Sequence, residues 1–231
     1  MKTAGMIAGL GPETTVDYYR AIIAEYQRRK PDRSAPALIM NSLDVEKGLG
    51  MLRADRPQDL TDYLVAAIER LERAGCDFGF IAANTPHIVF DEVQERVRLP
   101  LLSIVAATFA EASRQRLKHP ALLGTGFTMK ARFYPDVFTR GGIPLVLPAP
   151  AEQDYIHDRY MNELLKGVLL DETRAGLVEI MERIKRDEEI DGLIFAGTEL
   201  PLILRAAGDM GVPVLDTTLI HVNAIVDRIL S

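Results

Sequence analysis

Polar residues follow two apolar segments of the chain in the same way, and their types and positions are suited to ligand chemistry. Residues 77–86 read DFGFIAANTP and residues 191–201 read DGLIFAGTELP. In each segment the apolar run ends at a small residue, Ala83 or Gly197, which a polar residue follows. This pattern is typical of a buried parallel strand that ends at a site lined by backbone groups and hydroxyls.

A glycine-containing turn follows the first apolar run of the chain. Gly9, Leu10 and Gly11 lead to Pro12, a residue suited to the first position of a helix. Glycines let the backbone approach a ligand closely, and the N–H groups of a helix start favour an anion. We therefore expect Gly9, Leu10 and Gly11 to contact a carboxylate. A tight strand-to-helix turn without a ligand is the alternative.

The two halves of the chain repeat the same landmarks. Gly9 and Gly124, each within a Gly-x-Gly turn, are 115 positions apart. Ala83 and Gly197 are 114 apart, and the prolines that open two later apolar segments are 113 apart. Three landmarks at nearly one offset predict two tandem copies of one α/β half. Chance similarity among generic strands is the alternative.

The order of segments predicts two tandem, pseudo-symmetric three-layer α/β domains with mostly parallel sheets and the site in the cleft between them. The N-terminal domain comprises residues 1–104 with 216–231, and the C-terminal domain comprises 105–215. Strands are expected at 3–9, 36–41, 77–83, 100–104, 120–124, 144–148, 191–196 and 212–215. Helices are expected at 12–30, 58–74, 88–97, 105–116, 129–140, 153–167, 171–187, just after Pro201, and at 219–230, the last packing on the N-terminal domain.

The segment after the second strand, residues 42–57, carries Gly48 and Gly50 among charged residues and is predicted to be a mobile loop. Loops at the carboxyl ends of parallel strands bind ligands in open α/β sheets. Asp44 and Lys47 are therefore candidate ligand contacts, with plain solvated charges as the alternative.

Composition narrows the class of protein. The chain has 231 residues, 48% of them hydrophobic, and a net charge of −6 without a block of Lys or Arg, which argues against a nucleic-acid or anionic-membrane surface. It has no apolar run of the roughly 20 residues needed to span a bilayer. Its one cysteine allows neither an internal disulfide nor a cysteine-based metal site. We expect a cytoplasmic protein whose N-terminus forms a strand, not a signal peptide.

Four motifs in order resemble the cofactor-independent aspartate/glutamate racemases. They are the turn at Gly9, the Asn84-Thr85-x-His87 turn, Gly124-Thr-Gly-x-Thr128, and residues 198–201, TELP. The resemblance covers essentially the whole chain. It implies two similar α/β domains with the site in the cleft between them, no cofactor, no metal, and a dimer as the family habit. The scattered His119, His157 and His221 also lack the spacing of a metal site.

In the family that the chain resembles, two cysteines exchange protons with opposite faces of the α-carbon. Their positions are occupied here by Ala83 and Gly197. Two-base racemisation needs a titratable group on each face, and neither residue offers one. Cys76 lies seven residues before Ala83 on the same strand, too far away to replace a thiol. Small residues at both positions are also expected to leave extra room for a bulkier substrate or for water.

The nearest ionisable residues are His87 and Glu199, which are candidate acid/base groups; packing by His87 and backbone orientation by Glu199 are the alternatives. The resemblance implies that short donors at the strand ends hold the substrate's carboxylate and amino groups, with helix capping as the alternative for any one threonine. Lys166 matches a position that reaches a side-chain carboxylate, or is a plain exposed lysine. The expected donors are Asn84, Thr85, Thr125, Thr128 and Thr198.

These residues together predict a racemase-family protein that acts on a small amino acid or carboxylate without pyridoxal phosphate. Because both thiols of the two-base mechanism are missing, we do not predict that the protein racemises its substrate by that mechanism. One alternative is a carboxylate-binding protein without catalysis. Another is a lyase or isomerase that uses other acid/base groups. A third alternative is that Ala83 and Gly197 were introduced in place of the two cysteines to abolish racemisation.

Overall fold

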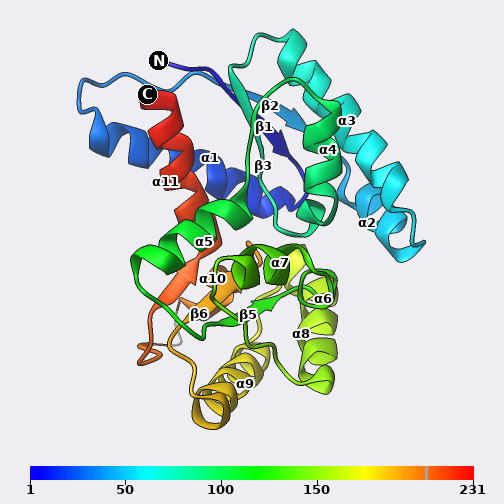
Figure 1. The fold of residues 1–231 in the computed structure, drawn as a ribbon, viewed down its shortest axis with the longest axis vertical. Helices are drawn as coiled ribbons and strands as arrows, with labels where there is room; N and C mark the ends of the chain where they lie inside the picture. The colour runs from blue at the N-terminus through cyan, green and yellow to red at the C-terminus, as the bar shows by residue number, and fades with distance from the viewer. Residues whose placement is uncertain (206–207) are drawn as a thin grey trace. The chain divides into compact units, whose positions relative to one another are not determined.

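The structure, a computed structural model, describes residues 1–205 and 208–231 (Figure 1). The chain divides into two compact units. Unit 1 comprises residues 1–107 with 218–231, and unit 2 comprises residues 108–217. One boundary falls inside helix α5 (Ile104–Arg114) and the other at the start of helix α11 (Thr217–Leu230).

Unit 1 is built on a parallel sheet with the strand order β2-β1-β3-β4. Strand β1 is central, and its Gly5 lies opposite Ile39 of β2 and Gly79 of β3. The strands are β1 (Ala4–Ala8), β2 (Leu38–Ser42), β3 (Phe78–Ile81) and β4 (Leu101–Leu102). The helical segments are α1 (Pro12–Arg29), α2 (Val45–Arg53), α3 (Pro57–Arg73), the 3₁₀ turn η1 (Thr85–Val89) and α4 (Phe90–Arg96), with α11 at the end of the chain.

Alternating strand residues divide the core of unit 1 into two halves. Met6 and Phe80 are buried with apolar residues of α1 and α11. Ile7 and Ile81, which point to the other face, are buried with residues of α3 and α4. Figure 1 shows α1 and α11 on one side of these strands and α3 and α4 on the other. Unit 1 is therefore a three-layer α/β unit whose strands are apolar on both faces.

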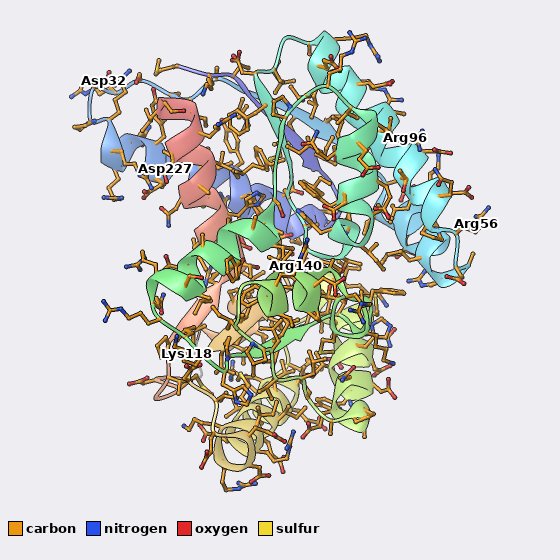
Figure 2. The ribbon with its side chains drawn as sticks, viewed as in Figure 1. Asp32, Arg56, Arg96, Lys118, Arg140 and Asp227 are labelled. Carbon is orange, nitrogen blue, oxygen red and sulfur yellow. The ribbon has the colours of Figure 1, made fainter. Side chains whose placement is uncertain are left out.

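Helix α11 is fixed to the N-terminal part of the chain. Its apolar residues Val222, Ile225 and Val226 lie in the same buried cluster as strand β1. Arg29 of α1 forms an ion pair with Asp227 of α11, which is labelled in Figure 2. The C-terminal helix thus completes the layer that begins with α1, although it is the last element of the chain.

The prediction of a mobile loop at residues 42–57 is wrong. Residues Val45–Arg53 form helix α2, and the Asp44 carboxylate caps its start by accepting hydrogen bonds from the backbone N–H groups of Glu46 at 2.9 Å and Lys47 at 3.3 Å. A good N-cap stabilises a helix by about 1 kcal/mol, which offsets much of the helix-breaking tendency of the two glycines. The Lys47 ammonium lies 4.7 Å from the centre of the Tyr63 ring.

Unit 2 repeats the arrangement with a shorter parallel sheet in the order β5-β6-β7. The strands are β5 (Ala121–Gly124), β6 (Leu193–Ala196) and β7 (Val214–Asp216). Leu123 and Phe195 are buried with apolar residues of α8, α9 and α10. After α5, the helical segments are α6 (Gly126–Lys130), α7 (Phe133–Arg140), α8 (Pro150–Asn162), the 3₁₀ turn η2 (Leu164–Lys166), α9 (Asp171–Glu188) and α10 (Leu200–Leu204).

Two expectations for unit 2 are corrected. Residues 144–148 do not form a full strand: Val146 alone makes a parallel bridge to Ala121. Pro144 and Pro148 bracket this segment and lack the N–H groups that a ladder needs. The helix expected at 129–140 is split into α6 and α7 at residues 131–132.

Charged side chains project from the outer faces of the helices (Figure 2). Arg96 of α4 pairs with Asp62 of α3 at 2.6 Å, and Arg56 pairs with Asp59 at 2.9 Å. Such exposed pairs contribute on the order of 0–1 kcal/mol each. Within residues 1–205 and 208–231, no helix combines the length and the apolar character required to cross a membrane.

Candidate functional site

The turn after β1 has a conformation that requires glycine at its first position. Gly9 has φ +78°, and a Cβ placed there would lie 2.3 Å from the Leu43 carbonyl oxygen. The Gly9 N–H donates to the Thr15 hydroxyl at 2.9 Å, and that hydroxyl donates to the Gly11 carbonyl at 2.9 Å. The first amide of the expected anion site is thus used within the turn. Leu10 packs in the apolar cluster of α3 and α4.

In the turn after β3, His87 is tied to the backbone at both ring nitrogens. Nδ1 lies 3.0 Å from the Ala83 carbonyl oxygen, and Nε2 accepts the Ile104 N–H at 3.3 Å. The ring stacks on Phe90 with centroids 4.9 Å apart. This pairing assigns the proton to Nδ1, and burial lowers the pKa of His87 to about 4. Both ring nitrogens are therefore engaged with backbone groups, one of them at Ala83, and an acid/base role for His87 stays a prediction.

The residues next to His87 in this turn are mostly buried. Ala83 and Asn84 are buried, Thr85 is half-buried, and Asn84 precedes the first residue of η1. Cys76 comes before β3 and Ala83 after it, so the thiol is at the opposite end of the strand. Its surroundings are apolar, and burial raises its pKa. The sole cysteine is thus part of the core of unit 1.

A second buried imidazole lies in unit 1 close to His87. His221 of α11 accepts a hydrogen bond from the Tyr18 hydroxyl at Nδ1, at 3.0 Å, and donates from Nε2 to the Leu102 carbonyl at 3.2 Å. Burial lowers the pKa of His221 to about 3, and the charge of His87 lowers it further. Both rings are therefore neutral at pH 7, and both hold backbone carbonyls at the carboxyl ends of strands.

In unit 2, the turn after β5 is closed by its own threonines. The Thr125 hydroxyl caps α6 by accepting the Thr128 N–H at 3.1 Å, and the two hydroxyl oxygens are 3.2 Å apart. A Cβ at Gly124 would lie 2.6 Å from the Ala196 carbonyl oxygen, so the ends of β5 and β6 are in close contact. Thr125 thus caps α6, and its contact with a substrate stays a prediction.

Helix α8 places a histidine on this same turn. The Gly126 N–H donates to Nδ1 of His157 at 3.1 Å, and the His157 ring meets Phe127 edge-to-face with centroids 5.2 Å apart. A Cβ at Gly126 would lie 2.9 Å from His157 Cγ. Gly126 is therefore needed for the imidazole to reach the turn. Sequence reasoning considered His157 only as a metal ligand and missed this contact.

One turn further along α8, Tyr160 fills the space beside Gly197. A Cβ at Gly197 would lie 2.7 Å from both the hydroxyl oxygen and Cε2 of the Tyr160 ring. The expected extra room at this position is therefore absent, because a phenol ring takes the place of a side chain at residue 197. Residues three apart on a helix share a face, so the His157-x-x-Tyr160 spacing was the signal in the sequence that pointed to this pair.

Tyr160, Thr198 and Glu199 form a buried hydrogen-bonded group. The Tyr160 hydroxyl and the Thr198 hydroxyl both donate to Oε2 of Glu199, the latter at 2.8 Å. The Glu199 N–H donates back to the Tyr160 oxygen at 3.2 Å. All three residues are at most 8% exposed. Burial raises the pKa of Tyr160 well above its usual value, and the Glu199 charge raises it further. The structure thus gives the Glu199 carboxylate two hydroxyl partners in unit 2.

The remaining candidate, Lys166, lies at the end of the 3₁₀ turn η2 with an exposed side chain. Gly167, which follows it, adopts φ +73° and ends the turn. The Lys166 N–H donates to the Glu163 carbonyl at 3.0 Å. Its contact with a substrate carboxylate stays a prediction.

The candidate residues lie on two parallel α/β units whose strands end in turns of glycine, alanine, threonine and asparagine. The sequence pattern of the Asp/Glu/Hydantoin racemase family matches residues 7–225. The chain belongs to this family.

Relatives and solved structures agree with this assignment. The broad specificity amino-acid racemase RacX of Bacillus subtilis is 26% identical over an alignment that covers 93% of this chain and 92% of RacX. A Yersinia pestis protein solved as a candidate Asp/Glu racemase is 29% identical, with a TM-score of 0.91 and full coverage of both chains. An aspartate racemase homologue from Pyrococcus horikoshii is 33% identical, with a TM-score of 0.82 and full coverage of both chains.

Proposed function

We propose that this protein binds a small amino acid or related carboxylate and exchanges its α-proton without pyridoxal phosphate. Membership of the Asp/Glu/Hydantoin racemase family supports the reaction class, and the similarity to a broad specificity amino-acid racemase supports the substrate class. The observation that carries the proposal is the buried group of Tyr160, Thr198 and Glu199, which puts ionisable chemistry beside Gly197.

The proposed chemistry differs from two-thiol racemisation. Neither Ala83 nor Gly197 carries a titratable group, and an acid/base group is needed on each face of the α-carbon for efficient inversion. We therefore expect proton exchange to proceed faster than inversion of configuration. The substrate and its side chain are left open by this proposal, because residues 45–50, VEKGLG, offer only Lys47 where the family that the chain resembles has an arginine for a dicarboxylate.

The test is solvent isotope exchange. The protein is incubated in D₂O with the L- and D-forms of aspartate, glutamate and alanine, and the α-proton signal is followed by proton NMR. Chiral chromatography of the same samples measures inversion, and trapping of released CO₂ detects a lyase reaction. Loss of the α-proton signal with slower inversion is the expected result.

A second candidate function is carboxylate binding without catalysis. The absence of an ionisable side chain at both Ala83 and Gly197 favours it. Calorimetric titration with the same compounds distinguishes the two functions. Binding without any deuterium entering the α-position would support the binding protein and refute the proposed exchange reaction.

A further inference from the structure

We propose that Tyr160 is a catalytic residue and that Glu199 is its proton partner, so that a phenol and a carboxylate replace the thiol that the family places at position 197. This inference rests on the proposed function and names the group that carries out the exchange. Glu199 belongs to the TELP motif at residues 198–201, whereas Tyr160 lies outside all four motifs and is identified by the structure alone.

Position is the first argument. Gly197 directly follows strand β6, and the Tyr160 hydroxyl oxygen lies 2.7 Å from the point that a Cβ of residue 197 would occupy. The phenol oxygen therefore lies directly beside the place of a cysteine side chain at this position. A larger residue at 197 would displace the ring. The glycine and the tyrosine fit each other as a pair.

Hydrogen bonding is the second argument. The Tyr160 hydroxyl donates to Glu199 Oε2, so a carboxylate is in hydrogen-bonding position to accept the phenolic proton. The Glu199 N–H donates to the phenol oxygen at 3.2 Å and would stabilise negative charge there. The Thr198 hydroxyl holds the same carboxylate oxygen at 2.8 Å and fixes its orientation. Both Tyr160 and Glu199 are only 3% exposed, which strengthens these interactions.

The proton-transfer step balances within these groups and the substrate. The α-C–H bond breaks, and its electron pair passes into the substrate carboxylate as an enediolate. The α-proton bonds to the Tyr160 oxygen while the phenolic proton moves to Glu199 Oε2, so Glu199 becomes neutral and the substrate gains one negative charge. The reverse movement returns a proton to the same face. If the proton now on the Tyr160 oxygen is replaced by deuterium from D₂O in between, by way of the Glu199 carboxyl group with which it shares a hydrogen bond, deuterium enters the α-position with retention of configuration.

The test uses Tyr160→Phe and Glu199→Gln, with Tyr155→Phe as the matched control on the same helix. The Arg159 guanidinium carbon lies 5.2 Å from the centre of the Tyr155 ring. Tyr155 is not part of the hydrogen-bonded group of Tyr160, Thr198 and Glu199. The readout is the rate at which deuterium enters the α-position of the amino acid that wild type labels fastest. We expect each test variant to lose about 100-fold or more in this rate, and the control to stay within about twofold.

Two further measurements separate the possible outcomes. Circular dichroism and urea unfolding establish that each variant is folded; if Tyr160→Phe does not fold, Glu199→Gln, which keeps the shape of the side chain, decides the matter. Wild-type exchange that persists within about threefold in the folded variants would overturn the role of the pair and leave the proposed function standing. A wild-type protein that labels none of the amino acids would refute both.

Discussion

Two buried histidines make the stability of unit 1 depend on pH. The pKa of His87 is lowered to about 4 and that of His221 to about 3, from an ordinary value of 6.5. At a pH between about 4 and 6.5, both histidines therefore tend to be protonated in the unfolded chain and neutral in the folded chain. The free energy of unfolding must fall as the pH falls below 6.5, and it gains nothing further from these groups above about pH 7.5.

The magnitude follows from the size of the pKa differences. Each pH unit below 6.5 costs about 1.4 kcal/mol for each histidine that stays neutral in the folded state. Lowering the pH from 7.5 to 5.0 therefore costs about 2 kcal/mol per histidine, or about 4 kcal/mol for both. Glu25 and Asp32, whose pKa values are lowered to about 2, lose their stabilising effect only below about pH 4.5. They do not contribute within this window.

Urea unfolding followed by circular dichroism at 222 nm measures this effect, since the chain has no tryptophan for fluorescence. His221→Leu should halve the difference between pH 7.5 and pH 5.0, whatever its effect on stability at pH 7.5. His119→Gln is the matched control, because His119 is exposed and its side chain should not alter the difference. If the two units unfold separately, the effect belongs to the transition of unit 1. A wild-type difference below about 1 kcal/mol would contradict the burial of both neutral rings.

Further substitutions test the packing. Gly197→Ala should lower the free energy of unfolding by about 1–3 kcal/mol, because its Cβ would meet the Tyr160 ring at 2.7 Å. Gly50→Ala, within α2 and without any atom inside 4 Å of the new Cβ, should instead raise it by about 0.5–1 kcal/mol. Asp44→Ala should cost about 1 kcal/mol by removing the cap of α2. Urea unfolding at pH 7.5 measures all three; equal effects of the two glycine substitutions would refute the packing argument, and an unchanged Asp44→Ala would refute the capping argument.

The sequence by itself determined most of the local structure. Runs of apolar residues that stop at glycine, alanine or threonine predicted strands such as β3 and β6, and Pro12 predicted the start of α1. These signals depend on residues within a few positions of each other, so they can be read along the chain. The same local reasoning failed at α2, where the cap by Asp44 offset much of the effect of Gly48 and Gly50, and at residues 144–148, where two prolines removed ladder donors.

Only the tertiary structure decided which side chains occupy the turns. Tyr160 and Glu199 are 39 positions apart, and α8 must pack on the unit 2 sheet before the phenol reaches Gly197. His87 meets the Ile104 N–H 17 positions away, and His221 meets Leu102 across 119 positions. Whether the space beside a glycine is open, and whether an imidazole is free to titrate, depends on distant segments that close packing brings together. The residue pattern of one short segment carries no information on which distant side chains pack against it.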